Sequence, residues 1–172
     1  MNPAPGLPAV LAAACGQGHA WIAARVPHAG RMCLLDGVAQ ATPEAITCTA
    51  ASHRAADHPL RQHGRLGAAC GVEYAAQAMA LHGALRAELR QTAPARMGLL
   101  VSLRGLRLHV ARLDDLAADL TIHAEREADN GDHCIYRFQL SAERRLLLQG
   151  RATVLLDAAP QNLSPDSKRP TP

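Results

Sequence analysis

A single acidic residue, Glu73, stands inside a long apolar stretch of this sequence. Residues 66–85 read LGAACGVEYAAQAMALHGAL, and no other residue among them carries a formal charge. A carboxylate with such neighbours is costly to bury unless it is paired, hydrogen-bonded or protonated. Carboxylates in unusual settings of this kind are typical of active sites. The stretch therefore predicts a reaction centre in which Glu73 acts as an acid or a base.

Other polar residues are placed to assist Glu73. Gln77 follows four positions later, on the same face of a helix. His58 and His63 come earlier, in the polar segment 52–65, and each is a candidate proton-abstracting base. His82 falls on the opposite side of the helix, so we interpret it as a core or interface histidine.

Backbone amides provide a further group. A helix that begins near Leu66 leaves the N–H groups of its first turn, around Gly67 to Ala69, without partners inside the helix. Such amides can polarise a carbonyl oxygen on which negative charge develops. Gly67 is therefore a candidate substrate-binding residue.

The elements that must position these groups are one long helix and a series of strands. The helix is predicted over residues 66–90, and a second, short helical turn over residues 20–26, which ends at Pro27. Residues 129–132, DNGD, predict a hairpin turn. Strands are predicted over residues 31–40, 45–51, 97–103, 107–113, 116–126, 133–142 and 145–156.

The composition of the long helix predicts how the strands surround it. Its alanines and glycines are distributed around most of its circumference, whereas an amphipathic surface helix would show one polar face. A helix that is small and apolar on every side must be covered on every side. The sequence therefore predicts an α+β hot dog fold, in which a curved antiparallel sheet wraps one central helix.

The chain has the length of one domain. We assign residues 1–19 to an N-terminal segment with room for one short helix, residues 20–157 to the hot dog domain, and residues 158–172 to a disordered tail. The 18 Lys and Arg against 15 Asp and Glu leave a net charge of only +3, and the arginines are scattered without aromatic residues between them. These features argue against a nucleic-acid-binding protein.

The five cysteines indicate the cellular setting. They lie far apart, and none forms a C-x-x-C pair, so neither a zinc site nor a disulfide framework is expected. We expect reduced, mostly buried thiols in a cytoplasmic protein. The apolar stretches are interrupted by charges, so no membrane span is expected, and the histidines show no metal-ligand spacing.

Two motifs resemble those of a known family. Residues 27–38, PHAGRMCLLDGV, resemble the PHR-x-P-x-L-L-x-D-x-V opening of 3-hydroxyacyl-acyl-carrier-protein dehydratases, and residues 71–78, GVEYAAQA, resemble their E-x-x-A-Q helix. The variants PHxGxM, LLD and GxEYxAQ are more similar still to the dehydratase-like proteins of aryl-polyene and xanthomonadin-type pigment clusters. The resemblance covers roughly residues 20–156 and includes the hot dog order of elements.

The resemblance implies a reaction and a set of roles. A base removes the proton alpha to a thioester carbonyl, and Glu73 protonates the departing 3-hydroxyl. The amide near Gly67 polarises the carbonyl, His28 lines the substrate tunnel, and Gln77 orients Glu73. The substrate is carried on the phosphopantetheine arm of acyl carrier protein, and no metal or organic cofactor is needed.

One departure from the family concerns the base. The related enzymes carry a histidine in an HFP segment, and base and acid come from different protomers. The matching segment here, residues 57–67, lacks HFP and is shorter, so His63 or His58 is left as the candidate base. A homodimer, or a heterodimer with a hot dog homologue, is the expected assembly.

Three functions therefore compete. The first is a dehydratase acting on 3-hydroxyacyl thioesters of acyl carrier protein. The second is a non-catalytic or half-catalytic subunit that pairs with a dehydratase homologue, which the missing HFP segment favours. The third is a hot dog thioesterase, which directs water to the carbonyl instead. A structural interpretation also exists for Glu73, as a glutamate neutralised by Arg31 or Arg65.

Overall fold

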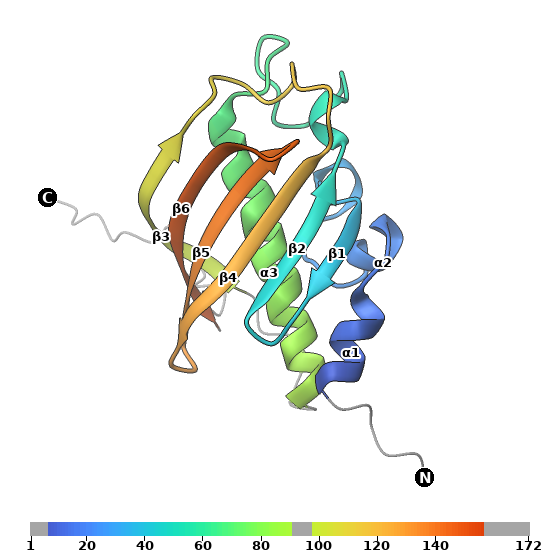
Figure 1. Ribbon diagram of the computed structural model, residues 1–172, viewed down its shortest axis with the longest axis vertical. Helices are drawn as coiled ribbons and strands as arrows, with labels where there is room; N and C mark the ends of the chain where they lie inside the picture. The colour runs from blue at the N-terminus through green and yellow to red at the C-terminus, as the bar shows by residue number, and fades with distance from the viewer. Residues whose placement is uncertain (1–6, 91–97, 157–172) are drawn as a thin grey trace, which may run out of the picture.

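A curved antiparallel sheet wraps a twenty-residue helix, α3 (Gly71–Arg90), in the computed structural model, which describes residues 7–90 and 98–156 (Figure 1). The six strands lie in the order β1-β2-β4-β5-β6-β3, and all neighbouring pairs are antiparallel. The strands are β1 (Gly37–Ala41), β2 (Ala45–Ala50), β3 (Gly98–Leu108), β4 (Leu120–Asp129), β5 (His133–Ala142) and β6 (Arg145–Leu156). The predicted hot dog fold is confirmed.

Several predicted boundaries are corrected. Only the end of the predicted strand 31–40 is extended as β1, because Gly30–Met32 is a 3-10 turn and residues 33–35 pass inward as a buried loop. One bent strand, β3, replaces the two strands predicted over residues 97–103 and 107–113, and it ends at Leu108. Residues 109–113 are not a strand and contribute only an isolated bridge at Arg112. Irregular register between Arg104 and Arg107, with Gly105 at φ 59°, explains the apparent interruption.

The helical boundaries differ in the same way. The long helix starts at Gly71, after a 3-10 turn over Ala68–Cys70, rather than at Leu66. The strand predicted over residues 116–126 starts only at Leu120. Two short helices, α1 (Leu7–Ala14) and α2 (His19–Ala23), occupy the N-terminal region, and α2 ends three residues before the end predicted for the helical turn 20–26. Residues 158–172, predicted to be disordered, lie outside the described residues.

The core lies between α3 and the concave face of the sheet. The buried residues of α3 include Tyr74, Ala78 and Leu81, which face inward-pointing residues of β4 and β5 such as Ile122 and Phe138. The helix is not covered on every side, because one stripe of small residues that begins at Glu73 remains half-buried. This stripe keeps the acidic side chain accessible.

Gly71 fixes the contact between the start of α3 and β6. A Cβ atom at this position would lie 2.2 Å from Leu148 Cδ2 and 3.0 Å from Leu140 Cδ2. A larger residue would force the buried Leu148 and Leu140 side chains to shift, so glycine lets the first turn of α3, which carries Glu73, lie directly against the sheet.

His82 is a core histidine, as interpreted from the sequence. It is fully buried, with Nδ1 2.9 Å from the Tyr136 hydroxyl and Nε2 2.9 Å from the Thr42 carbonyl oxygen. The carbonyl can only accept, so Nε2 carries the proton and Nδ1 accepts from the hydroxyl. Burial lowers the pKa of His82 to about 4.

The N-terminal helices cover the side of α3 near its C-terminal end. Trp21 of α2 is half-buried against the core, and the Arg25 guanidinium lies 3.8 Å from the centre of its ring. Arg25 also pairs with Glu88 of α3 at 3.0 Å. These contacts join α2 to the central helix.

Strand β3 forms an edge of the sheet and is exposed. Its inner neighbour is β6, and no described strand pairs with its other side. Five of its large apolar side chains are exposed by 37–53%: Leu99, Leu100, Val101, Leu103 and Leu108.

No helix among the described residues is long and apolar enough to cross a membrane.

Candidate active site

Glu73 lies in the first turn of α3 and is paired rather than isolated. Its Oε1 accepts a hydrogen bond from Gln77 Nε2 at 3.0 Å and lies 3.0 Å from His28 Nε2. The side chain remains 30% exposed. The suggested partners Arg31 and Arg65 do not neutralise it, since Arg31 pairs with Asp57 and Arg65 forms no ion pair within the described chain.

Gln77 holds the segment around His28 against the helix. It is fully buried, its Oε1 accepts from the Leu34 backbone N–H at 2.8 Å, and its Nε2 donates to the Met32 carbonyl at 2.7 Å. The Leu34 N–H requires an acceptor, so the amide oxygen must face Leu34. The amide nitrogen is thereby directed to Glu73, which makes Gln77 an orienting residue.

His28 enters the site from the loop before the 3-10 turn Gly30–Met32 and is 26% exposed. Its Nδ1 is buried and has no hydrogen-bond partner among the described residues. A proton on Nδ1 would therefore be unsatisfied, and the tautomer with the proton on Nε2 fits the contact with Glu73. His28, predicted to line the substrate tunnel, lies at the carboxylate itself.

His58 belongs to a buried hydrogen-bond chain. Its Nδ1 accepts from the Leu60 N–H at 3.1 Å, and its Nε2 lies 3.0 Å from the Tyr74 hydroxyl. Tyr74 continues to the Ser52 hydroxyl at 2.9 Å, which donates to the Leu34 carbonyl at 2.8 Å. Because every group has a partner, this chain fixes His58 with its proton on Nε2.

The pKa values of His58 and Tyr74 are shifted in the directions that burial produces. Burial lowers the pKa of His58, and the nearby positive charge of Arg61 lowers it further. Burial raises the pKa of Tyr74 to about 12. His58 is therefore a neutral ring with both nitrogens engaged, an arrangement that serves the structure of the loop.

His63, the other candidate base, lies at the surface. It is exposed at a left-handed φ of 50°, in the turn closed by hydrogen bonds between Gln62 and Arg65. No contact joins it to Glu73 within the described residues. Of the three histidines proposed for the site, the structure brings only His28 to Glu73.

Gly67 lies in a short ladder that leads into α3. Leu113 N–H donates to the Leu66 carbonyl at 2.8 Å, and Ala68 N–H donates to the Ala111 carbonyl at 3.1 Å. The predicted free amide of Ala68 is therefore occupied. Amides alternate in direction along an extended chain, so the Gly67 N–H is directed away from residues 111–113. It makes no hydrogen bond to any described group.

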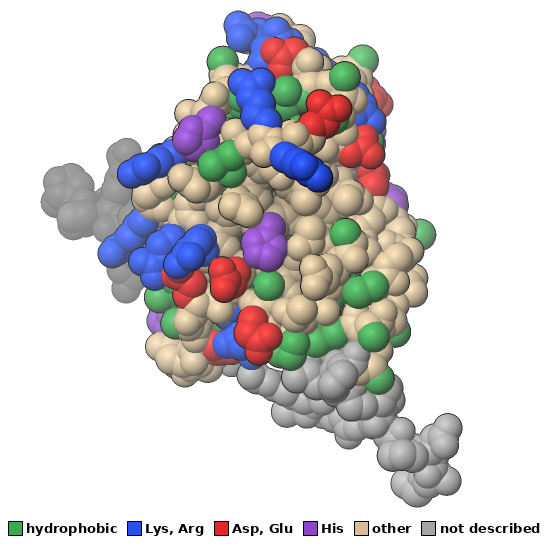
Figure 2. All heavy atoms as spheres, in the orientation of Figure 1, with side chains coloured by type: hydrophobic (Ala, Val, Ile, Leu, Met, Phe, Trp, Pro, Cys, Tyr) green, Lys and Arg blue, Asp and Glu red, His purple; other side chains and the backbone are tan. Residues whose placement is uncertain are grey.

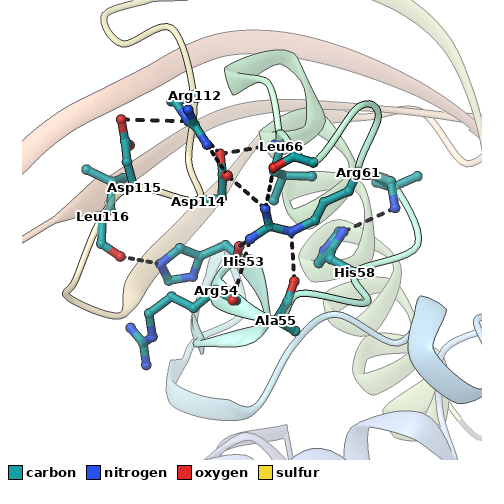
Figure 3. Close-up of polar contacts among 12 residues, drawn as sticks. His53, Arg54, Ala55, His58, Arg61, Leu66, Arg112, Asp114, Asp115 and Leu116 are labelled. Atoms are coloured by element: carbon teal, nitrogen blue, oxygen red, sulfur yellow. Dashed lines mark hydrogen bonds and ion pairs between the residues drawn. The ribbon is translucent and has the colours of Figure 1, made fainter.

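Asp114 anchors this ladder and the loop that carries His58 (Figure 3). It is 3% exposed, accepts from the Leu66 N–H at 3.0 Å, and pairs with Arg61 and Arg112. Hydrogen bonding to Arg112 holds the pKa of Asp114 far below its usual range. Arg61 also donates to the Ala55 carbonyl at 2.8 Å, which ties the loop to the same centre.

Sequence reasoning did not identify Arg61, Asp114 or Tyr74 as parts of this region. Their partners lie far away along the chain, and no spacing in the sequence indicates the contacts. Within the described ranges 7–90 and 98–156, no group of three or more His, Cys, Asp or Glu side chains is arranged to hold a metal ion. The contacts therefore join the Glu73 carboxylate, the His28 imidazole and the Gln77 amide into one candidate site.

Structural comparisons agree with the fold. The dehydratase heterocomplex ApeI:P from Xenorhabdus doucetiae matches with a TM-score of 0.69 and 21% identity, over 78% of this chain and 90% of that chain. Thioesterase superfamily member 2 from zebrafish matches with a TM-score of 0.57 and 17% identity, over 89% and 99% of the two chains. At such identities the likeness shows the fold alone.

Sequence comparisons identify the family. No curated protein matches this chain at a significant level. The model of the ApeP-like family, described as ApeP dehydratase, matches residues 20–164, which include the PHxGxM segment and the GxEYxAQ helix. This chain therefore belongs to the ApeP-like family of hot dog dehydratases.

Proposed function

We propose that this chain takes part in removing water from 3-hydroxyacyl thioesters of acyl carrier protein, as the Glu73-bearing subunit of a two-chain hot dog dehydratase. The reaction belongs to fatty-acid-like or polyene pigment synthesis in the cytoplasm. It needs no metal or organic cofactor beyond the phosphopantetheine arm that carries the acyl group. The observation that supports this proposal most is the partly exposed Glu73 carboxyl, which contacts both His28 and Gln77 at the start of α3.

The proposed chemistry assigns one step to each group. A base takes the proton from C2, the electron pair forms the C2–C3 double bond, and the C3 hydroxyl leaves. Glu73 gives that hydroxyl a proton, so that it departs as water. The Gly67 N–H donates to the thioester carbonyl oxygen, on which negative charge develops. His28 and Gln77 keep the carboxyl in place.

The base is assigned to a partner subunit. His58 has both ring nitrogens occupied, and His63 is exposed in a turn without contact to Glu73. Neither side chain is poised to remove a proton beside Glu73. The dehydratase to which this chain is similar in fold is a heterocomplex, ApeI:P. The exposed apolar edge strand β3 supports an assembly of the same kind, a heterodimer with a hot dog homologue.

The test follows acyl carrier protein by intact mass spectrometry. The chain is incubated with 3-hydroxyacyl-acyl carrier protein, first alone and then together with a candidate hot dog partner that resembles the other subunit of ApeI:P. We expect the loss of one water only when both chains are present. Glu73→Gln should lower kcat by about 10²–10⁴, whereas Glu88→Gln, on the exposed end of the same helix, should not. Full activity of Glu73→Gln would exclude the assigned acid role.

A thioesterase would use the same carboxylate for a different product. It would direct water to the carbonyl and release the free pantetheine thiol. The same mass measurement separates the two reactions, because dehydration leaves the acyl group attached to the carrier. Dehydration by this chain alone would mean that one of its own histidines is the base.

A further inference from the structure

The exposed edge strand β3 is both apolar and basic. Five of its large apolar side chains are exposed, and the strand, GLLVSLRGLRL, carries only two charged residues, Arg104 and Arg107. Both arginines are exposed. Neither forms an ion pair with any residue that the structure describes.

A row of arginines runs across the outer face of the sheet to this edge. Arg137 lies opposite Glu125 on one side and Arg151 on the other, and Arg151 in turn lies opposite Arg104. Glu127 pairs with both Arg137 and Arg151. Figure 2 shows Lys and Arg side chains gathered over this part of the sheet, on the left of the view, with acidic side chains beside them.

The positive charges of this row are neutralised at Arg137 and Arg151, which pair with Glu127, but not at Arg104 on the edge strand. Like charges directly opposite one another on neighbouring strands are destabilising. Arg104 lies opposite Arg151 and forms no ion pair within the described chain. The position beyond Arg104, where a further strand would lie, is the place at which a carboxylate would restore the balance.

Edge protection alone does not explain these arginines. Charged residues on an edge strand do discourage pairing with other chains. Here, however, five large apolar side chains are exposed on the same strand, which is the pattern of a surface that another protein covers. The arginines are therefore better explained as selecting which strand pairs with β3.

We infer that β3 pairs with an edge strand that carries carboxylates opposite Arg104 and Arg107, on a different hot dog subunit and not on a second copy of this chain. A copy would add two more arginines and no carboxylate, because β3 contains none. The inference rests on the proposed two-chain dehydratase and gives the chemistry by which the partner is chosen.

A charge-swap experiment tests this selection with the full chain alone. The variant Arg104→Glu/Arg107→Glu supplies the carboxylates that a partner edge would present. Self-association of the wild type, self-association of the variant, and association in an equimolar mixture are compared by sedimentation velocity. We expect the mixture to associate about tenfold more tightly than either chain alone at low salt. The difference should shrink in high salt, because exposed charges are then screened.

Two controls define the contact. Arg65→Glu/Arg144→Glu changes the net charge equally, at exposed positions outside β3, and its mixture with wild type should associate no better than wild type alone. Val101→Lys, placed in both members of the charge-swapped pair, should abolish the gain, since Val101 is 47% exposed on the edge strand.

The opposite results overturn the inference. A wild-type homodimer as tight as the charge-swapped mixture would show that the arginines do not select the partner. A gain that survives Val101→Lys would place the contact elsewhere. Because association is measured without substrate, its outcome stands apart from the dehydration assay. A wild-type homodimer that dehydrates the substrate would refute the charge selection and leave the activity intact.

Discussion

Gly67→Pro removes one backbone N–H and leaves the rest of the proposed site in place. Gly67 has φ −64° and ψ 152°, which proline adopts without strain, and a Cβ atom there would meet nothing within 4 Å. The Gly67 N–H is not used in the ladder with residues 111–113. Gly67→Ala fits the same backbone and keeps the N–H, so it is the matched control.

The two effects of this change differ in size and sign. Proline at a compatible glycine position stabilises by about 0.4–1 kcal/mol, because the unfolded chain loses freedom. Removing one donor to a developing oxyanion costs about 10²–10³ in kcat, or roughly 3–4 kcal/mol. We therefore expect Gly67→Pro to unfold at the same temperature as wild type, or slightly higher, while its turnover falls by at least about a hundredfold.

The assay is dehydration of 3-hydroxyacyl-acyl carrier protein in the presence of the partner subunit, with kcat and KM measured separately. A lost transition-state donor lowers kcat, whereas a proline ring that merely obstructs the substrate raises KM. Gly67→Ala should retain wild-type kcat. Wild-type kcat in Gly67→Pro, at unchanged stability, would refute the assignment of this amide to the carbonyl oxygen.

Two further predictions concern the paired histidines and tyrosines of the core. The folded pKa of His82, about 4, lies below its ordinary value of 6.5, so the unfolded state binds the proton more tightly and stability falls as pH falls from about 6.5 towards 4. The free energy of unfolding falls by about 2 kcal/mol by pH 5. In His82→Gln, whose amide can still bond Tyr136 and Thr42, the free energy of unfolding measured in urea should change much less between pH 7 and pH 5. An unchanged pH dependence would contradict this prediction. Tyr74→Phe leaves His58 Nε2–H without a partner and should lower stability by about 1–3 kcal/mol with kcat within about twofold of wild type; a large fall in kcat would show that His58 takes part in the chemistry.

Local patterns in the sequence predicted much of the fold. Strands β5 and β6 have the predicted bounds, and the small residues of α3 predicted a helix enclosed by a sheet. The errors fall where the pattern is not local. Residues 33–35 read as part of a strand because they are apolar, but they are buried as a loop that Gln77 holds through the Leu34 amide. Residues 104–106 were predicted to separate two strands, whereas Gly105 bends one continuous strand.

The site was predictable only where its residues share one helix. Glu73 and Gln77 lie one turn apart, and their contact follows from helical geometry. The contact of His28 with Glu73 depends on how the loop that carries His28 packs against the helix. The sequence therefore indicated both motifs but not the contact between them. The engagement of His58 with Tyr74, and of Asp114 with Arg61, likewise depends on how loops distant in sequence pack together.

The position of the sole tryptophan determines what a common unfolding experiment reports. Trp21 lies on α2 beside Arg25, outside the sheet, while the core aromatic residues are two tyrosines and one phenylalanine. Tryptophan fluorescence therefore reports whether the N-terminal arm, here α1 and α2, is detached from the rest of the protein. Far-ultraviolet circular dichroism reports the unfolding of α3 and the sheet. Coincident curves would make arm and body one cooperative unit. An earlier fluorescence transition would identify the arm as a separately folding element, docked through Arg25 and Glu88.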